Sequence, residues 1–334
     1  MSVWLPTAPC TPGACVEQAR AAAAVPRAVL RLTAVTILVL AGIALSPLGW
    51  GSPRLRGRIP AEWVRRWCRT IVRAMGVRIR VTGTAAPAGG LLLVANHVSW
   101  LDIPLLTAVR PARMLAKTEV RQWPVAGALA ARGGALFIER DRLRALPGTV
   151  AAIADALRAG AAVTAFPEGS TWCGRAHGRF RRAVFQAALD AGVPVQPVGL
   201  RYRQQGGGPG TAAAFVGEDT LLASLWRVAR ARGLVAEVEI RPVIPPGGHP
   251  DRRALAHAAQ PAAPEPAWTH AALIADDRTA APRRDAEPRP AAAAAAGSAT
   301  GHDGAPARRG RMTAPPPPHG TARNEPVQGM TRAR

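Results

Sequence analysis

The distribution of apolar residues divides the chain into regions of different character. Residues 1–27 are rich in proline and show no apolar periodicity, which is typical of an irregular leader. An apolar run follows, and no charge occurs between Arg31 and Arg54, a gap of 22 residues. A helix of this length crosses the roughly 30 Å hydrocarbon core of a bilayer. The pattern therefore predicts a membrane-embedded segment over residues 28–53.

Two alternatives to a spanning helix remain open, a cleaved signal peptide and a re-entrant or interfacial hairpin. The run from Leu32 to Trp50 exceeds the usual apolar region of a signal peptide, about 7–15 residues. Three arginines precede the run, whereas six follow it within about 20 residues. Positive charge is enriched on the cytoplasmic side of membrane segments. We therefore expect an inner (plasma) membrane protein whose following domain faces the cytoplasm.

A basic amphipathic helix is predicted over residues 61–76. Its apolar residues recur at helical spacing, and four arginines lie between them. Such a helix either packs on its own domain or lies on anionic lipid with Trp63 and Trp67 inserted. The sequence leaves both alternatives open.

From Val77 the chain alternates short apolar runs with helical stretches. This alternation predicts an α/β domain over residues 54–257, with a mixed, largely parallel sheet flanked by helices. The predicted strands are 77–81, 91–95, 113–117, 135–139, 162–166, 193–202 and 236–243. The predicted helices are 104–109, 120–131, 142–159, 179–190 and 219–232.

Residues 258–334 lose this periodicity. They contain six consecutive alanines at 291–296 and four consecutive prolines at 315–318. Too few apolar side chains are present to offset the entropy of ordering the chain. We therefore predict a disordered, low-complexity tail.

Composition narrows the classes of partner. The chain of 334 residues carries 43 Lys and Arg against 21 Asp and Glu, a formal net charge of +22, and +19 of it falls within residues 1–257. A basic folded part suits an anionic partner such as nucleic acid, phospholipid or a phosphorylated substrate. The four cysteines show no C-x-x-C pairing, which argues against a disulfide scaffold and a zinc ribbon, and no metal site is predicted. A phosphate-binding loop of the P-loop type is also missing from the sequence.

A histidine and an aspartate follow the buried run 91–95, in the order Asn96-His97-x-x-x-x-Asp102. Ligands bind at the carboxyl ends of strands in α/β sheets. There an Asp that accepts a proton from one ring nitrogen leaves the other nitrogen basic. A continuous helix would turn the two side chains apart by about 140°. We therefore expect a strand-to-helix turn, made by Ile103-Pro104. Taken alone, the spacing also fits a helix cap.

Two further blocks lie at predicted strand ends. Gly134 to Arg140 ends in an arginine, a residue that binds phosphate through two parallel hydrogen bonds. Phe166-Pro167-Glu168-Gly169-Ser170-Thr171 places a carboxylate and hydroxyls on a glycine turn. In a parallel sheet these ends share the edge that carries His97. Taken singly, Arg140 also fits a surface ion pair, and the second block fits an ordinary turn.

These blocks occur in a fixed order with a fourth, Val193-Pro194-Val195-x-Pro197-Val198. Together they resemble the lysophosphatidic acid (1-acylglycerol-3-phosphate) acyltransferase family, a resemblance that covers about residues 55–256. It implies that His97 is the general base and that Asp102 orients it. Further implied roles are phosphate binding by Arg140 and Lys117, and a contribution to the acceptor site by Glu168, Gly169 and Ser170.

The resemblance also implies the reaction. A fatty acyl group would move from acyl-CoA or acyl carrier protein to 1-acylglycerol-3-phosphate, giving phosphatidic acid without an acyl-enzyme, a metal or another cofactor. Two alternatives remain open: acylation of another lysolipid, such as lyso-ornithine lipid or a lysophospholipid, and an inactive basic lipid-binding protein. The expected partners are the lysolipid, the acyl donor and an anionic membrane, and not nucleic acid. The residues Trp172-Cys173-Gly174-Arg175 could redirect acceptor choice. No base supports Cys173 as a nucleophile, and His177 is a weaker candidate phosphate contact.

Overall fold

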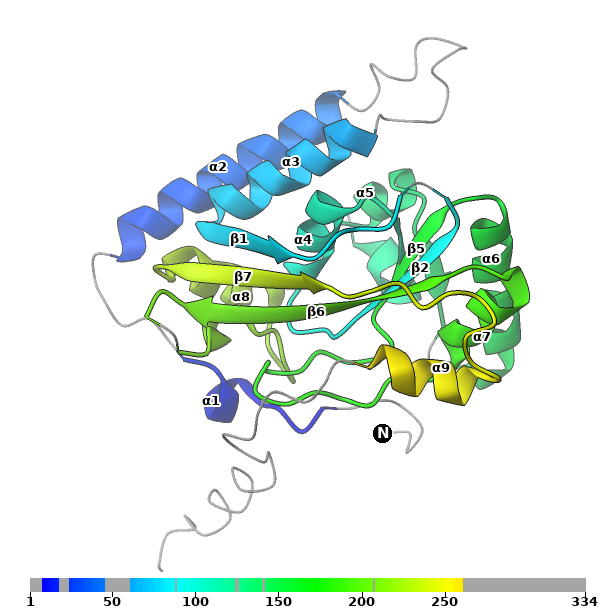
Figure 1. Cartoon of the computed structure of the whole chain (residues 1–334). Helices are drawn as coiled ribbons and strands as arrows, with labels where there is room; N and C mark the ends of the chain where they lie inside the picture. Colours follow the sequence, from blue (N-terminus) through cyan, green and yellow to red (C-terminus); the bar gives the residue numbers. More distant parts are fainter. Residues whose placement is uncertain are drawn as a thin grey trace, which may run out of the picture. The chain divides into compact units, whose positions relative to one another are not determined.

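The computed structural model describes residues 8–17, 24–45, 61–87, 89–123, 126–139, 142–206 and 208–260. Seven strands form one sheet in the order β1-β7-β6-β2-β5-β3-β4 (Figure 1). The strands are β1 (Val77–Thr82), β2 (Leu91–Ala95), β3 (Arg113–Lys117), β4 (Leu136–Ile138), β5 (Ala162–Ala165), β6 (Val195–Gln204) and β7 (Leu234–Ile240).

The sheet is mixed and largely parallel, which confirms the predicted fold class. Strands β2, β3, β4, β5 and β6 run in one direction. Strand β7 is antiparallel to β6, and β1 is parallel to β7. The carboxyl ends of β2, β5, β3 and β4 therefore lie at one edge of the sheet, where the sequence blocks with candidate chemistry were expected to meet.

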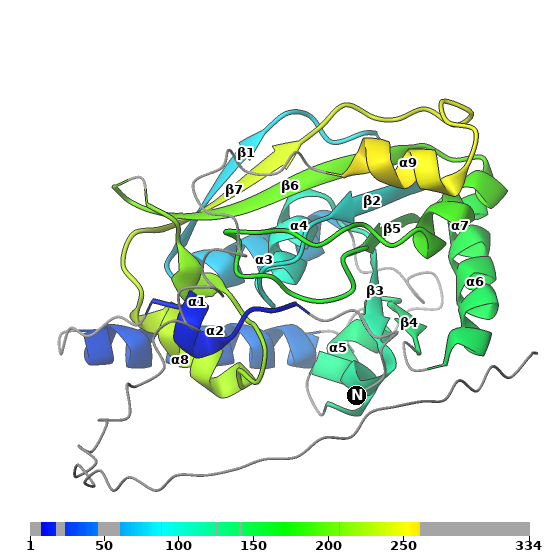
Figure 2. The ribbon, with the colours of Figure 1, turned by 90° about the horizontal axis from the view of Figure 1, so that it is seen from below.

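Helices cover both faces of the sheet (Figure 2). They are α3 (Ala61–Ala74), α4 (Asp102–Val109), α5 (Ala126–Arg132), α6 (Leu146–Arg158), α7 (Ala183–Ala191), α8 (Leu221–Arg230) and α9 (Arg252–Ala259). The central strand β2 alternates between two buried clusters. Leu91, Leu93 and Ala95 pack with residues of α3, α4 and α8, whereas Leu92 and Val94 pack with residues of α6, α7 and α9. Burial on both faces explains why this strand is an unbroken apolar run.

The apolar helix of the N-terminal region is α2 (Ala24–Leu45), which is long and apolar enough to cross a membrane by length and composition. It begins four residues earlier than predicted, and residues 46–53 of the predicted segment lie outside the described residues. Its first half is attached to α8. Arg31 donates to the carbonyl oxygens of Ala229 and Ala231, at 3.0 and 2.7 Å, and Arg27 donates to that of Arg230. These guanidinium groups satisfy carbonyls that a helix end leaves without partners.

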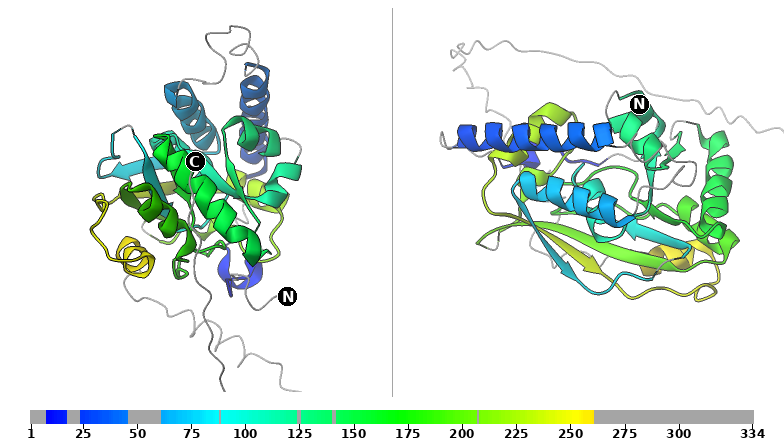
Figure 3. Two further views of the ribbon diagram at one scale, coloured as in Figure 1. Left: turned by 90° about the vertical axis from the view of Figure 1, so that its right-hand side faces the viewer. Right: turned by 90° about the horizontal axis from the view of Figure 1, so that it is seen from above.

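Helices α2 and α3 lie side by side (Figure 3). The indole of Trp67 donates to the carbonyl oxygen of Leu38 at 2.9 Å, and a side chain larger than hydrogen at Gly42 would collide with this ring. On α3 itself, Cys68, Ile71 and Val72 are buried. Of the two alternatives for this amphipathic helix, the structure shows packing on its own domain, through a face that also contacts α2.

Other elements differ from the sequence prediction in ways that follow from local chemistry. The predicted helix 120–131 is divided into a 3-10 turn at Thr118–Gln122 and α5, consistent with Pro124, which disfavours helix at the preceding residue. A one-turn helix, α1 (Pro12–Cys15), lies in the leader that was predicted to be irregular. Helix α9 ends two residues beyond the predicted domain boundary at 257. The predicted tail from residue 261 onward lies outside the described residues.

Candidate active site

The pair of His97 and Asp102 forms at the carboxyl end of β2. The strand ends at Ala95, residues 96–101 make the turn, and Asp102 is the first residue of α4. The expectation that Ile103-Pro104 makes this turn was wrong, since both residues are helical. Pro104 is tolerated there because the N–H groups of a first helical turn have no partner within the helix. His97 Nδ1 lies 2.8 Å from Asp102 Oδ2.

The Asp102 carboxylate is fully buried and meets four hydrogen-bond donors. Besides the His97 ring, Oδ2 accepts from the backbone N–H groups of Val98 at 2.7 Å and Ser99 at 2.8 Å. Oδ1 accepts from the Tyr202 hydroxyl at 2.6 Å. Burying a carboxylate is costly unless it is hydrogen-bonded, and these donors supply the compensation. The carboxylate is thereby fixed in place beside the imidazole.

The geometry sets the chemistry of the histidine. An ionised carboxylate is an acceptor, so Nδ1 carries the ring proton and Nε2 keeps a basic lone pair. The His97 side chain is 17% exposed. Its ring stacks on Phe166, with centroids 4.0 Å apart and planes inclined by 13°. The imidazole is therefore held by a hydrogen bond at one nitrogen and by an aromatic face.

Glu168 lies directly behind this histidine. Its Oε2 accepts from the backbone N–H of His97 at 2.7 Å, and its Oε1 accepts from that of Gly178 at 3.0 Å. Burial raises the pKa of this carboxyl to about 8, although the two backbone hydrogen bonds oppose the shift. These bonds join the turn after β2 to the loop after β5. The structure thus gives Glu168 a supporting position under His97, and its contribution to an acceptor site stays a prediction.

The remaining residues of this block follow in the same loop. Gly169 has φ of 76°, a backbone conformation that favours glycine, and its N–H donates to the carbonyl oxygen of Phe166 at 3.1 Å. Ser170 is half-buried next to it. The N–H of Trp172 donates to the carbonyl oxygen of His97 at 2.8 Å. The loop is therefore attached to the backbone of His97 through Trp172 as well as through Glu168.

His177 lies near the end of this loop, with a side chain that is 9% exposed and Nδ1 3.7 Å from Glu168 Oε1. Burial, with a smaller contribution from Arg201, lowers the pKa of His177 to about 4. Its imidazole is therefore neutral at pH 7 and brings no positive charge to a phosphate.

Of the two cations assigned to phosphate binding, Lys117 is among the described residues and Arg140 is not. Lys117 is the last residue of β3, is exposed, and is in register with Ile138 of β4. Strand β3 is two positions from β2 in the sheet, about 10 Å at the usual strand spacing. Lys117 therefore shares the sheet edge of His97 but is separated from it by β5. Arg140 lies outside the described residues.

Two supporting residues were given no role from the sequence. Tyr202, the one tyrosine of the chain, reaches Asp102 from β6, and burial together with the nearby carboxylate raises the pKa of its phenol. Asn96 joins β2 to β6, since its Nδ2 donates to the carbonyl oxygen of Leu200 and its Oδ1 accepts from the N–H of Leu200. A lone tyrosine ending an apolar strand was the available signal for Tyr202.

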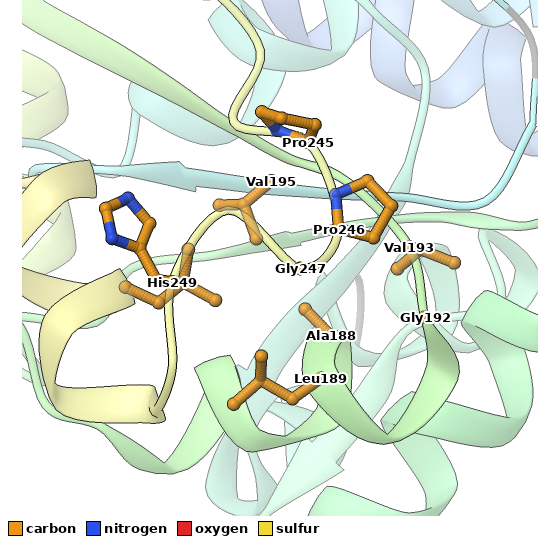
Figure 4. Close-up of a pocket in the computed structure, with 10 residues that line it drawn as sticks. Ala188, Leu189, Gly192, Val193, Val195, Pro245, Pro246, Gly247 and His249 are labelled. Atoms are coloured by element: carbon orange, nitrogen blue, oxygen red, sulfur yellow. The ribbon is translucent and has the colours of Figure 1, made fainter.

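A hollow between α7, the start of β6 and α9 is lined by residues such as Leu189, Val195, Pro246 and His249 (Figure 4). Val195 pairs with Leu92 near the start of β2, whereas His97 follows the end of that strand. None of the predicted site residues lines this hollow, so it is separate from the candidate active site.

Known proteins that are similar to this chain are acyltransferases. A family model described as Acyltransferase matches residues 78–201. The lyso-ornithine lipid O-acyltransferase of Pseudomonas aeruginosa is 39% identical over 245 residues, which are 70% of this chain and 91% of that protein. The 1-acyl-sn-glycerol-3-phosphate acyltransferase of Neisseria meningitidis is 35% identical over 216 residues, 64% of this chain and 82% of that protein.

The fold also matches a solved structure. The crystal structure of the 1-acyl-sn-glycerophosphate acyltransferase of Thermotoga maritima superposes with a TM-score of 0.54 at 18% identity, covering 71% of this chain and 91% of that one. At this identity the likeness concerns the fold alone. The sequence relationship to the P. aeruginosa protein extends over nearly all of that protein, and it confirms the resemblance read from the four sequence blocks. The chain therefore belongs to the acyltransferase family, and its His97 and Asp102 fit the family's His-x-x-x-x-Asp pattern.

Proposed function

We propose that this protein transfers a fatty acyl group from acyl-CoA or acyl carrier protein to the free hydroxyl of lyso-ornithine lipid. The observation that carries this acceptor is the 39% identity, over 91% of its length, to the P. aeruginosa enzyme of that name. The main expectation from the sequence blocks was 1-acylglycerol-3-phosphate, with lyso-ornithine lipid as an alternative. The comparison favours the alternative.

In the proposed first step, His97 Nε2 takes the proton of the acceptor hydroxyl. The hydrogen bond between Nδ1 and Asp102 fixes the tautomer that leaves Nε2 basic, and it stabilises the imidazolium that forms. Stacking on Phe166 keeps the ring in one plane. The proton acceptor is therefore oriented before the substrate arrives.

In the second step, the acceptor oxygen attacks the carbonyl carbon of the acyl thioester. A C–O bond forms, the C–S bond breaks, and the leaving thiolate takes the proton back from His97. The ester and the free thiol are the products, and the histidine returns to its starting state. This direct transfer needs no acyl-enzyme.

A second candidate acceptor, 1-acylglycerol-3-phosphate, is favoured by the N. meningitidis relative and by the position of Lys117 at the sheet edge that carries His97. The two acceptors differ in chemistry, because an ornithine headgroup carries amino and carboxyl groups but no phosphate. A residue that binds phosphate therefore discriminates between them.

The acceptor is tested with membranes that contain the full-length protein, supplied with each lysolipid and acyl-CoA and assayed by lipid mass spectrometry. We expect kcat/KM for lyso-ornithine lipid to exceed that for 1-acylglycerol-3-phosphate by at least about tenfold. Loss of a charge-assisted bond to phosphate costs roughly 1.5–3 kcal/mol. Arg140→Ala should therefore raise KM for the phosphate-bearing acceptor by about 10- to 100-fold and leave KM for acyl-CoA unchanged.

Arg142→Ala is the matched control, since Arg142 is a neighbouring exposed arginine that pairs with Glu139 at 3.6 Å. It should leave both KM values near those of the wild type. A wild-type preference for 1-acylglycerol-3-phosphate would reverse the proposed acceptor. If Arg140→Ala changed KM for the phosphate-bearing acceptor and KM for acyl-CoA equally, Arg140 would not be a headgroup-binding residue.

We further propose that α2 attaches the enzyme to the cytoplasmic face of the inner membrane by lying in the interface. Large apolar residues of α2 are exposed, Leu30 at 72% and Ile37 at 60% among them. Helix α3 runs beside α2 and carries the exposed arginines Arg65, Arg66 and Arg73. If α2 crossed the bilayer, those charges would enter the hydrocarbon core at high cost. Shallow insertion keeps them among anionic headgroups.

The membrane attachment is tested by the double substitution Ile37→Glu and Leu40→Glu, which places two charges on the exposed side of α2. We expect the wild-type protein to stay with the membrane fraction in high salt and the variant to move largely to the soluble fraction. Val243→Glu, at an exposed apolar residue beyond β7, is the control and should stay with the membrane. Release of the wild type by salt alone would contradict hydrophobic attachment through α2.

A further inference from the structure

Three of the four cysteines of the chain meet at one point. Cys10 and Cys15 belong to the leader segment 8–17, and Cys173 belongs to the loop after β5. Their sulfur atoms all lie within 4.8 Å of one another, and all three side chains are buried. The sequence shows no such grouping, because 158 positions separate Cys15 from Cys173.

The one-turn helix α1 brings the first two thiols together. Thr11 caps it, with Oγ1 accepting from the N–H of Ala14 at 3.4 Å, and Pro12 is its first residue. The N–H of Val16 donates to the carbonyl oxygen of Pro12 at 3.1 Å. This turn reverses the chain between Cys10 and Cys15, so both thiols face the same cluster.

The leader is held against the domain directly after Cys15, through Glu17. The N–H of Glu17 donates to the Thr211 hydroxyl at 3.2 Å, and Arg175 pairs with the Glu17 carboxylate at 3.1 Å. Helix α1 lies on the side of the sheet to which the loop after β5 also extends (Figure 1). Contacts of the neighbouring residues Glu17 and Arg175 thus keep the leader, and with it Cys10 and Cys15, beside Cys173.

We propose that Cys10, Cys15 and Cys173 bind one Zn²⁺ ion. Tetrahedral zinc with Zn–S bonds of about 2.3 Å requires sulfur atoms about 3.8 Å apart. Three thiols within 4.8 Å of one another reach that spacing by small side-chain rotations. Thiolates favour zinc over hard cations such as Mg²⁺ and Ca²⁺. A water molecule would complete the fourth position.

The proton balance of binding follows from the state of the thiols. A hydrogen bond with Cys173, followed by burial, raises the pKa of Cys10, and burial raises the pKa of Cys15. Free thiols are protonated at neutral pH, and the raised pKa values of Cys10 and Cys15 favour that state further. Zinc displaces three protons and forms three Zn–S bonds, leaving a site with a net charge of −1.

A zinc ion here would connect the leader to the loop that supports the catalytic histidine. Cys173 directly follows Trp172, whose N–H donates to the carbonyl oxygen of His97. The inference goes beyond the proposed acyl transfer and does not depend on the identity of the acceptor.

Buried cysteines also serve as small apolar core residues, and Cys68 provides that comparison. It is buried on α3, and burial raises the pKa of its thiol to about 12. It belongs to no cluster of potential metal ligands among the described residues. Cys68→Ser is therefore a control that removes one buried thiol and leaves the three-cysteine cluster intact.

The test uses the full-length protein purified in detergent and passed into chelator-free buffer. Elemental analysis should give about one zinc per chain for the wild type and for Cys68→Ser, and background for Cys10→Ser, Cys15→Ser and Cys173→Ser. After exchange with Co²⁺, the wild type should show near-ultraviolet absorption from thiolate-to-cobalt charge transfer. A chelator should increase alkylation of the three thiols in the wild type, a readout that does not depend on the folding of any variant.

Zinc at background in the wild type, together with cobalt spectra that lack thiolate charge transfer, would overturn the proposal. So would a disulfide between two of the three cysteines in freshly isolated protein. Equal loss of zinc in Cys68→Ser would assign the metal to another site. Alkylation that is unaffected by the chelator would likewise show that the thiols are ordinary core residues.

Discussion

Replacing His97 by Ala is expected to lower kcat by at least about 10²-fold, because general-base catalysis typically contributes 10²- to 10⁴-fold. The substitution removes the imidazole whose Nδ1 is hydrogen-bonded to Asp102 and whose Nε2 is left free to accept a proton. The measurement is single-turnover acyl transfer with saturating acceptor and donor, so that chemistry limits the rate. Circular dichroism should show an unchanged fold, since this side chain is partly exposed.

His249→Ala is the matched control, because His249 lines the hollow beside α9, near the start of β2, whereas His97 follows the end of that strand. It should keep near-normal turnover. Retention of turnover by His97→Ala under the same conditions would show that another group takes the proton of the acceptor.

Replacing Asp102 by Asn is expected to reduce kcat by a similar factor, at least about 10²-fold, with little change in either KM. An amide brings an NH₂ group into a position where every partner is a donor: the His97 ring, two backbone N–H groups and the Tyr202 hydroxyl. The NH₂ group of the new side chain then faces another hydrogen-bond donor. If that donor is the His97 ring, the histidine loses the acceptor that sets its tautomer. Steady-state kinetics measures the separate effects on kcat and KM.

The same substitution also tests whether Asp102 acts only as a structural anchor. In that case the thermal midpoint would fall while the folded molecules kept normal turnover, and the assigned orienting role would be wrong. Asp155→Asn provides the comparison for loss of a carboxylate, since Asp155 is exposed and pairs with Arg158 on α6. It should leave both turnover and stability close to those of the wild type.

The parallel part of the fold was predictable because its strands are buried on both faces. Leu91 to Ala95 reads as an unbroken apolar run, and the observed strand has the predicted bounds. The pairing of β7 with β6 and β1 was not predictable, since it depends on contacts between residues far apart in the sequence. The leader escaped prediction for a similar reason. Its few apolar side chains show no periodicity, and only contact with residues near 173 and 211 orders it.

The candidate site was predictable as a set of residue types at strand ends, but not in the direction of each side chain. His97 and Asp102 meet as their spacing indicated, because the strand-to-helix turn cancels the rotation that a helix would impose. Glu168 was expected to contribute to the acceptor site, which stays a prediction, and its two backbone hydrogen bonds beneath His97 were not foreseen. A sequence does not distinguish these orientations, since both place a carboxylate after a buried strand.

The arginine contacts between α2 and α8 have a consequence for lipid selection. Helix α8 also carries Ser224, whose hydroxyl accepts a hydrogen bond from the indole of Trp100 at 3.1 Å. Trp100 lies three residues after His97 in the same turn. A continuous series of contacts therefore connects the apolar helix to the turn that holds the base. If α2 lies in the interface as proposed, this connection sets the height of His97 above the lipid plane. The enzyme would then select acceptors by depth. It would acylate hydroxyl groups that lie at one depth in the membrane, and not chemically similar hydroxyl groups that lie deeper or shallower.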